Sequence, residues 1–330
     1  MEKSETRIGR SETTGRREPV IQVRGLRKSY GEQVVLDGIN LDVAEGTIFS
    51  LLGPNGAGKT TTVQILSTLI GADGGKVRVA GHDLARGPDG VRAAIGVTGQ
   101  FSAVDDLLTG EENLILMSDL RHLGRREGQK RAAELLERFD LVEVGKKTPA
   151  TYSGGMRRRL DLAMTLMGNP RVIFLDEPTT GLDPRSRRVM WRIIRDLVAG
   201  GVTIFLTTQY LEEADELADR IAVLDGGKLV AEGTPDELKR LIPGGHIRLR
   251  FADKRGLQTA ALALSDGSRD DEALTMQIPT DGGFRSLKIL IDRLDEACVP
   301  VEELSLHTPD LDDVFLALTD KPDSQKGGSR

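Results

Sequence analysis

The sequence contains little cysteine, no long apolar run and no excess of positive charge, and each shortage excludes a class of protein. Cys298 is the only cysteine among the 330 residues, so no internal disulfide can form and a reducing environment is indicated. The apolar runs fall far short of the ~20 residues that cross a bilayer, so we expect no membrane-spanning helix. The formal net charge of −6 provides no basic field for binding along a nucleic-acid duplex. We therefore expect no nucleic-acid partner.

Length and composition instead indicate a globular protein with more than one domain. Hydrophobic residues make up 38% and charged residues 29% of the chain, as in ordinary globular proteins. Its 330 residues exceed the usual size of one domain. Residues 1–18 and 321–330 are polar, and the first of these segments has no apolar core of the kind that a secretory signal requires. We expect both segments to be flexible tails.

Two α/β domains follow from the pattern of hydrophobic residues. Over residues 19–242, β-branched runs alternate with helical patterns, which predicts a mostly parallel sheet. Strand patterns are missing between about 101 and 165, and we interpret this stretch as an inserted helical subdomain. After a Pro-Gly-Gly linker, three strand patterns and two helical patterns predict a small C-terminal α/β domain at 246–320.

A glycine-rich loop lies between a buried strand pattern at 48–52 and a helical pattern at 59–69. Its sequence matches the phosphate-loop pattern G-x-x-x-x-G-K-[ST], and its position between strand and helix is the one that the mechanism requires. Backbone N–H groups and a helix N-terminus would surround the phosphates, Lys59 would reach the β and γ phosphates, and Thr60 would ligate Mg²⁺. The predicted nucleotide-binding residues are Gly53, Pro54, Asn55, Gly56, Ala57, Gly58, Lys59, Thr60 and Thr61.

Two adjacent carboxylates end the apolar strand pattern at 172–175. Because neighbouring side chains on a strand point to opposite sides, Asp176 and Glu177 need different roles. We expect Asp176 to contribute to the Mg²⁺ shell and Glu177 to polarise the water that attacks the γ-phosphate. With the glycine-rich loop, these acids predict a phosphate-loop NTPase core, and a kinase or GTPase remains an alternative at this point.

The segment Tyr152-Ser153-Gly154-Gly155-Met156 narrows the class. It resembles the signature motif of the ABC ATPase family, usually written LSGGQ, with Tyr152 in place of Leu and Met156 in place of Gln. The resemblance implies that Ser153, Gly154 and Gly155 complete the ATP site of a second copy of the chain, so that a homodimer closes over ATP. The segment at 181–183 resembles the family's D-loop, which places Asp183 against the opposite subunit.

Three further positions follow the order of the family's motifs. The resemblance implies that Tyr30 stacks on adenine and that Gln100, at the glutamine-loop position, touches Mg²⁺ and water. Where the family normally has a switch histidine that senses the γ-phosphate, this sequence has Gln209. A glutamine amide can donate a hydrogen bond to phosphate but carries no charge, so altered turnover is one expectation.

The segments at 152–161, 207–210 and 311–319 resemble the ATP-binding subunits of daunorubicin-type drug-resistance exporters. In that subgroup, glutamine at position 209 is expected. The resemblance implies an ATP hydrolase that energises efflux of a drug or lipid-like amphipathic compound through a separate integral-membrane permease, from the cytoplasmic side of the cell membrane. The alternative is a soluble ABC ATPase of the DNA repair or translation type. Such proteins usually carry two cassettes, long coiled coils or zinc-binding cysteines, which this sequence does not show.

Overall fold

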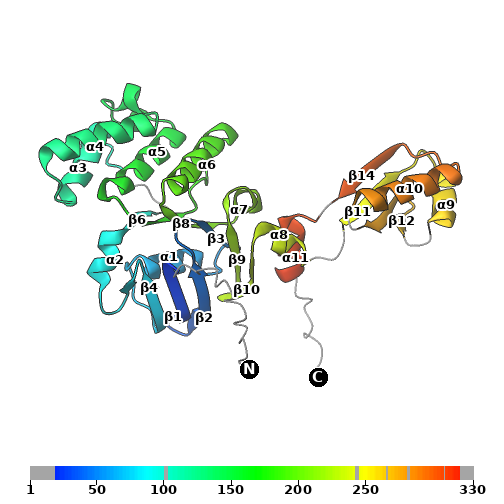
Figure 1. Ribbon diagram of the computed structural model, residues 1–330, viewed down its shortest axis with the longest axis horizontal. Coiled ribbons are helices and arrows are strands. Elements are labelled where there is room, and N and C mark those ends of the chain that lie inside the picture. Colours follow the sequence, from blue (N-terminus) through cyan, green and yellow to red (C-terminus); the bar gives the residue numbers. More distant parts are fainter. Residues whose placement is uncertain are drawn as a thin grey trace, which may run out of the picture. The chain divides into compact units, whose positions relative to one another are not determined.

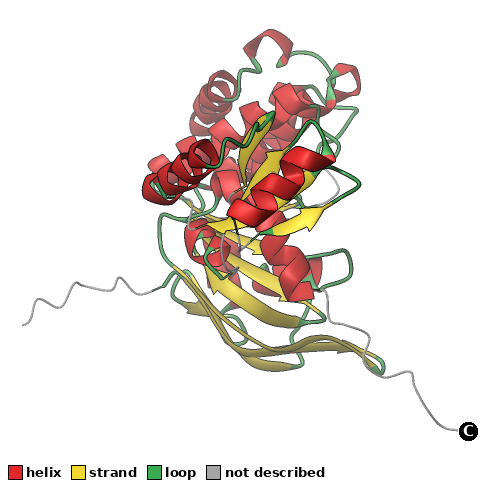
Figure 2. Cartoon of the chain, turned by 90° about the vertical axis from the view of Figure 1, so that its right-hand side faces the viewer, coloured by secondary structure: helices red, strands yellow, loops and turns green. Residues whose placement is uncertain are grey.

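The structure is a computed structural model that describes residues 19–99, 103–241, 245–264, 267–280, 283–307 and 309–319. The chain divides into two compact units, one comprising Met1–Gln209 with Leu224–Leu229 and the other Tyr210–Val223 with Val230–Arg330. Both predicted tails lie outside the described residues. Strands and helices occur together in the described chain, as an α/β fold requires (Figure 2). No helix in the described ranges is long and apolar enough to cross a bilayer.

The first unit begins with an antiparallel sheet of strand order β2-β1-β4-β5. Its buried side chains, including Ile21, Val23 and Leu26 on β1, alternate with less buried ones, which fits a sheet with one covered face. The sequence did not predict this sheet, because its alternation of strands and helices favoured one parallel sheet. The strands are β1 (Ile21–Tyr30), β2 (Gln33–Val43), β4 (Gly74–Val79) and β5 (His82–Asp83).

A second sheet has the strand order β10-β9-β3-β8-β7-β6. The neighbours β3, β8, β7 and β6 pair in parallel. Every residue of β3, β7 and β8 is buried, as in a parallel sheet covered on both faces. The predicted α/β fold class is therefore confirmed. The strands are β3 (Ile48–Leu52), β6 (Ile95–Thr98), β7 (Val172–Asp176), β8 (Thr203–Thr208), β9 (Arg220–Asp225) and β10 (Lys228–Gly233).

Six helices accompany these strands in the described part of the first unit. Within this unit, α3, α4 and α5 lie together, away from the antiparallel strands β1 and β2 (Figure 1). This cluster falls within the stretch predicted as a helical subdomain, whose bounds of about 101–165 stay a prediction. The helices are α1 (Lys59–Leu66), α2 (Pro88–Ala94), α3 (Gly110–Leu120), α4 (Arg125–Arg138), α5 (Gly154–Thr165) and α6 (Pro184–Ala199).

In the second unit, the last described helix packs against two helices that come much earlier in the chain. Helix α11 (Leu311–Thr319) contacts α7 (Leu211–Leu217) and α8 (Pro235–Lys239). Helix α8 has Thr234 as its N-cap, proline at its first position, and a reciprocal capping box with Glu237. These hydrogen bonds and the proline fix the start of this short helix.

The C-terminal segment of the second unit has the element order β-α-β-β-α-β of a ferredoxin-like fold. Its strands pair in the order β12-β13-β11-β14, all antiparallel. Strand β12 was not predicted, because its three residues are all exposed and leave no hydrophobic pattern. The elements are β11 (Gly245–Arg250), α9 (Lys254–Ala263), β12 (Ser268–Asp270), β13 (Thr275–Thr280), α10 (Phe284–Glu296) and β14 (Glu303–His307).

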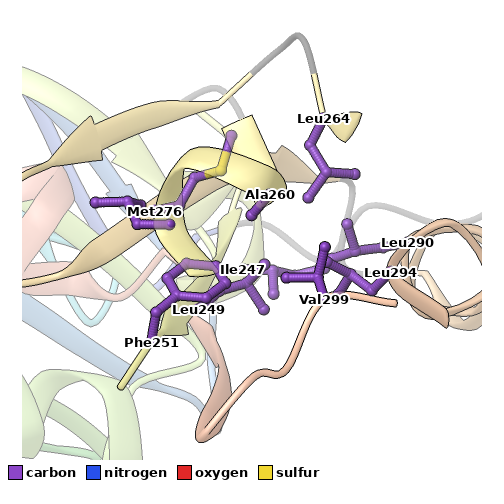
Figure 3. Packing of buried hydrophobic residues seen from close by; sticks show 10 residues of the cluster. Ile247, Leu249, Phe251, Ala260, Leu264, Met276, Leu290, Leu294 and Val299 are labelled. Atoms are coloured by element: carbon purple, nitrogen blue, oxygen red, sulfur yellow. The ribbon is translucent and has the colours of Figure 1, made fainter. Parts of the chain in front are cut away.

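One face of this small sheet carries a hydrophobic core of its own (Figure 3). Side chains of β11 and β13 pack against those of α9 and α10 around Leu249. The cluster consists of Ile247, Leu249, Phe251, Leu257, Ala260, Leu264, Met276, Leu290, Leu294 and Val299. This segment can therefore hold its fold through apolar burial, as a small domain does.

We expect Leu249→Ala to lower the free energy of unfolding of this segment by about 2–5 kcal/mol, because a fully buried leucine leaves a cavity when truncated. Faster amide hydrogen exchange over residues 245–307 would measure the loss. The matched control is Leu262→Ala on α9, where the leucine is 89% exposed and truncation should change stability by no more than about 0.5 kcal/mol. Equal effects of the two variants would contradict this packing.

Candidate active site

The glycine-rich loop connects the end of β3 to the start of α1. The N–H of Gly53 donates to the carbonyl of Thr208 on the neighbouring strand β8 (3.3 Å), which fixes where the loop begins. A Cβ on Gly53 would lie 2.3 Å from the carbonyl oxygen of Leu224, so no larger residue fits. Gly56 and Gly58 have φ of 83° and 108°, a region that side chains rarely adopt. The glycines of the pattern are thus explained by backbone geometry.

Lys59 is buried at the floor of this loop, with 5% of its side chain exposed. Its Nζ donates to the carbonyl oxygens of Gly53 (2.7 Å) and Pro54 (3.1 Å). The carboxylate of Glu177 lies 3.7 Å from the same ammonium group. Burial lowers the pKa of Lys59, and the charges of Glu177 and Asp176 oppose that shift. Lys59 Nζ therefore lies between the carbonyl groups of the loop and the Glu177 carboxylate.

Asp176, at the end of β7, is also buried and lies beside the start of α1. Its Oδ1 accepts hydrogen bonds from the hydroxyl groups of Thr207 and Thr60, the latter at 3.3 Å. Hydroxyl and carboxylate oxygens are the ligands that Mg²⁺ prefers. Within the described ranges, no cluster of three His, Cys, Asp or Glu side chains could hold a metal ion. The chemistry of the Thr60 hydroxyl and the Asp176 carboxylate fits Mg²⁺ that would take further ligands from phosphate and water.

Glu177 adopts a left-handed backbone conformation with φ of 49°, which is uncommon for any residue except glycine. Its N–H donates to both the carbonyl oxygen (3.1 Å) and the hydroxyl (3.2 Å) of Thr207, and its Oε2 accepts from the Thr180 hydroxyl (3.2 Å). Such strain persists only where several contacts fix the residue, and it occurs often at active sites. The turn directs the Glu177 carboxylate toward Lys59.

Lys59, Thr60 and Glu177 line a cavity of about 380 Å³, whereas Asp176 is not among its described lining residues. The sequence predicted most of its lining, but it missed Gln33 and Val35 of β2. Their position depends on pairing between distant segments, so no local motif marks them. Tyr30 pairs with Gln33 across the β1–β2 turn and is half exposed, and it is not among the described lining residues, so its predicted stacking on adenine stays a prediction. The lining residues are Gln33, Val35, Asn55, Gly56, Gly58, Lys59, Thr60, Thr61 and Glu177.

The signature segment lies at the start of α5. Ser153 is the N-cap of this helix, and its Oγ accepts from the N–H of Met156 (3.3 Å). A Cβ on Gly155 would lie 2.6 Å from the Ser186 hydroxyl, so this glycine permits close packing of α5 and α6. Ser153 and Gly154 are exposed. Among the described residues, these three do not line the cavity, so their predicted role requires a second molecule.

Asp183 has a local role that the motif did not indicate. It is the N-cap of α6, and its carboxylate accepts from the N–H groups of Arg185 and Ser186 (3.0 Å each) and from the Ser186 hydroxyl (2.6 Å). These hydrogen bonds, the Ser186 hydroxyl foremost, hold the pKa of Asp183 below its ordinary value. Its predicted contact with an opposite subunit stays a prediction, and helix capping is an independent reason for an aspartate here.

Of the two glutamines predicted to contact nucleotide, only Gln209 lies within the described residues. Gln209 directly follows Thr208, the last residue of β8. Because the carbonyl of Thr208 accepts a hydrogen bond from the N–H of Gly53, the backbone of Gln209 lies next to the start of the glycine-rich loop. It is not among the described residues that line the cavity. Gln100 lies outside the described residues. The roles assigned to both stay predictions.

The loop after the buried strand β3 leads into a helix that begins with a buried lysine, which is the arrangement of a phosphate-loop nucleotide-binding protein. Comparison with known proteins identifies the family. The family model described as ABC transporter matches residues 36–180. A daunorubicin resistance ATP-binding protein of Streptomyces coeruleorubidus is 51% identical, over 91% of this chain and 95% of that protein. A daunorubicin/doxorubicin resistance ATP-binding protein of Streptomyces peucetius is 46% identical, over 92% of this chain and 93% of that protein.

A solved structure gives the same assignment. It is a dimeric ATP-binding cassette in a post-hydrolysis state, bound to ADP and inorganic phosphate, with a TM-score of 0.60 and 27% identity over 65% of this chain and 98% of that chain. The chain belongs to the family of ABC transporter ATP-binding proteins, within the group of the daunorubicin and doxorubicin resistance proteins. It is an ATPase of this family, and the predicted fold, family and enzyme class are confirmed. A phosphate-loop kinase or GTPase is therefore excluded.

Proposed function

We propose that this chain is the ATP-hydrolysing subunit of an exporter and energises efflux of a drug-like amphipathic compound through a separate membrane permease. The 51% identity to a daunorubicin resistance protein supports this proposal most directly, because it extends over 91% of the chain and so includes the C-terminal segment as well as the ATPase core. Both Streptomyces relatives are named for drug resistance, and they give no support to the soluble alternative of the DNA repair or translation type.

The ATP site we propose is shared between two copies of the chain. One copy supplies the phosphate loop, with Tyr30 stacking on adenine and Lys59 contacting the β and γ phosphates. The other copy supplies Ser153, Gly154 and Gly155 at the N-terminus of α5. The exposure of Ser153 and its absence from the described cavity lining support a role in trans, as does the dimeric state of the similar solved cassette. A helix N-terminus with two glycines presents backbone N–H groups to an anion.

The proposed hydrolysis uses Thr60, Lys59 and Glu177 from the cavity lining together with groups outside it. Thr60 and Asp176, 3.3 Å apart at their oxygens, would hold Mg²⁺, with Gln100 as a further predicted contact. Mg²⁺ would neutralise charge on the β and γ phosphate oxygens. Glu177 accepts a proton from the attacking water, Lys59 binds the phosphate oxygens, and Gln209 donates a hydrogen bond to the γ-phosphate. Asp183 would contact the second copy. Hydrolysis then separates the two copies and lets the permease change its access.

Coexpression with a candidate permease, sought among the neighbouring genes, tests this function. We expect the chain to occur at the cytoplasmic side of the membrane as a peripheral subunit only when that permease is present. Cells with both proteins should retain less daunorubicin than cells that carry the same permease with the Glu177→Gln chain. A chain that stays out of the membrane fraction in the presence of the permease, or efflux that does not require Glu177, would contradict the proposal.

A further inference from the structure

Arg158, in the second turn of α5, donates hydrogen bonds to five acceptors that belong to three separate parts of the first unit. The side chain is largely buried, with 12% exposed. Three acceptors lie at the end of β7, one lies at the end of β6, and one lies on α5 itself. The contacts are Nε to the carbonyl of Pro178 (3.0 Å), Nη2 to the carbonyls of Asp176 (3.0 Å) and Glu177 (3.4 Å), and Nη1 to the carbonyl of Gly99 (2.9 Å) and to Asp161 Oδ2 (3.3 Å).

A guanidinium group has five N–H donors in a rigid plane, so one side chain can donate to all five of these acceptors. Three consecutive carbonyl groups, those of Asp176, Glu177 and Pro178, accept from Nε and Nη2 of this group. Glu177 is the residue in the strained left-handed conformation. Arg158 thus contributes to fixing the backbone that aims the proposed catalytic carboxylate.

Asp161 completes the arrangement on the next turn of α5. It is buried, one carboxylate oxygen accepts from Arg158, and the other accepts from the N–H of Ala103 (3.1 Å). Burial raises the pKa of Asp161, and the charge of Arg158 opposes that shift. The pair therefore attaches both Gly99 and Ala103 to the helix that starts at the signature segment.

The two neighbouring arginines make contacts of a different kind. Arg157 pairs with the half-exposed carboxylate of Asp106. Arg159 donates to the carbonyl of Phe139 (2.7 Å) and to Asp140, both at the end of α4. Three consecutive residues of one type thus bind three different parts of the fold, and the contacts of Arg158 are the ones that include the proposed catalytic residue.

We propose that Arg158 is a positioning residue for ATP hydrolysis. It holds the backbone of Glu177 in the conformation that directs its carboxylate toward the γ-phosphate, and it joins that backbone to the signature helix. This inference rests on the catalytic role proposed for Glu177. It assigns to α5 a function inside its own molecule, in addition to the role of its N-terminus in trans.

Comparing Arg158→Met with Arg159→Met in the full chain tests this inference. Displacement of the Glu177 carboxylate should lower kcat on the order of 100-fold in Arg158→Met. The affinity for a non-hydrolysable ATP analogue should stay near that of the parent protein, because the phosphate loop is untouched. Arg159→Met removes an equally charged side chain from the same helix and should leave kcat near the parent value. Equal loss of kcat in both variants would overturn the proposal.

Two further variants separate positioning from general damage to the fold. Arg158→Lys retains the charge but cannot span the planar set of acceptors, so its kcat should fall between those of the parent and Arg158→Met. A parent-like kcat in Arg158→Lys would overturn the proposal even if Arg158→Met did not fold. In the Glu177→Gln background, Arg158→Met should cause little further loss, since both act on one step. If the two substitutions lowered kcat by independent factors, so that the double variant showed their product, the result would contradict the proposal. Full turnover in Glu177→Gln alone would instead refute the role of Glu177.

Discussion

Glu177→Gln is expected to lower the steady-state rate of ATP hydrolysis by about 10²- to 10⁴-fold while leaving ATP binding intact. The amide cannot accept the proton of the attacking water, and general-base catalysis contributes a factor of this size. Binding should persist because the loop, Lys59 and Thr60 are unchanged. The amide oxygen can still accept the hydrogen bond from Thr180, so the local geometry should be retained.

A consequence of this variant is accumulation of a closed dimer when ATP is added. Size-exclusion chromatography with ATP and with ADP would measure it, beside a steady-state phosphate-release assay. Glu143→Gln makes the same chemical change at an exposed position and serves as the matched control. Full turnover in Glu177→Gln would refute the proposed role of this carboxylate, and a monomer in the presence of ATP would count against the shared site.

Lys59→Ala should act at an earlier step and weaken ATP binding itself. Hydrogen bonds from a charged donor contribute about 1.5–3 kcal/mol, which corresponds to roughly 10- to 150-fold in Kd. The variant also removes a buried positive charge that in the parent lies 3.7 Å from Glu177. The cavity would then be net acidic and would repel a triphosphate. Isothermal titration with ATP measures the change.

A second variant, Lys59→Met, separates charge from volume in this experiment. Methionine fills much of the space of the lysine stem and removes the ammonium group, so its Kd should resemble that of Lys59→Ala. Lys130→Ala, which removes an exposed lysine from α4, should bind ATP like the parent. Undiminished affinity in both Lys59 variants would exclude this lysine from phosphate binding.

Motifs formed by consecutive residues were predictable from the sequence. The phosphate loop is one case, because its glycines, lysine and helix start act through a single turn of backbone. The two acids at the end of the apolar strand pattern that became β7 are another. The resemblance to the ABC ATPase family identified two further segments from the sequence, the signature motif and the D-loop. In each case the chemistry depends on neighbours in the chain, so the sequence contains the information directly.

Contacts between distant segments were decided by the tertiary structure alone. Gln33 and Val35 line the cavity because β2 lies beside the glycine-rich loop. The three consecutive arginines of α5 look alike in the sequence, yet packing gives Arg158 the carbonyl groups at the end of β7. Strand pairing and helix packing select such partners, and no local pattern encodes which distant backbone will accept a given hydrogen bond.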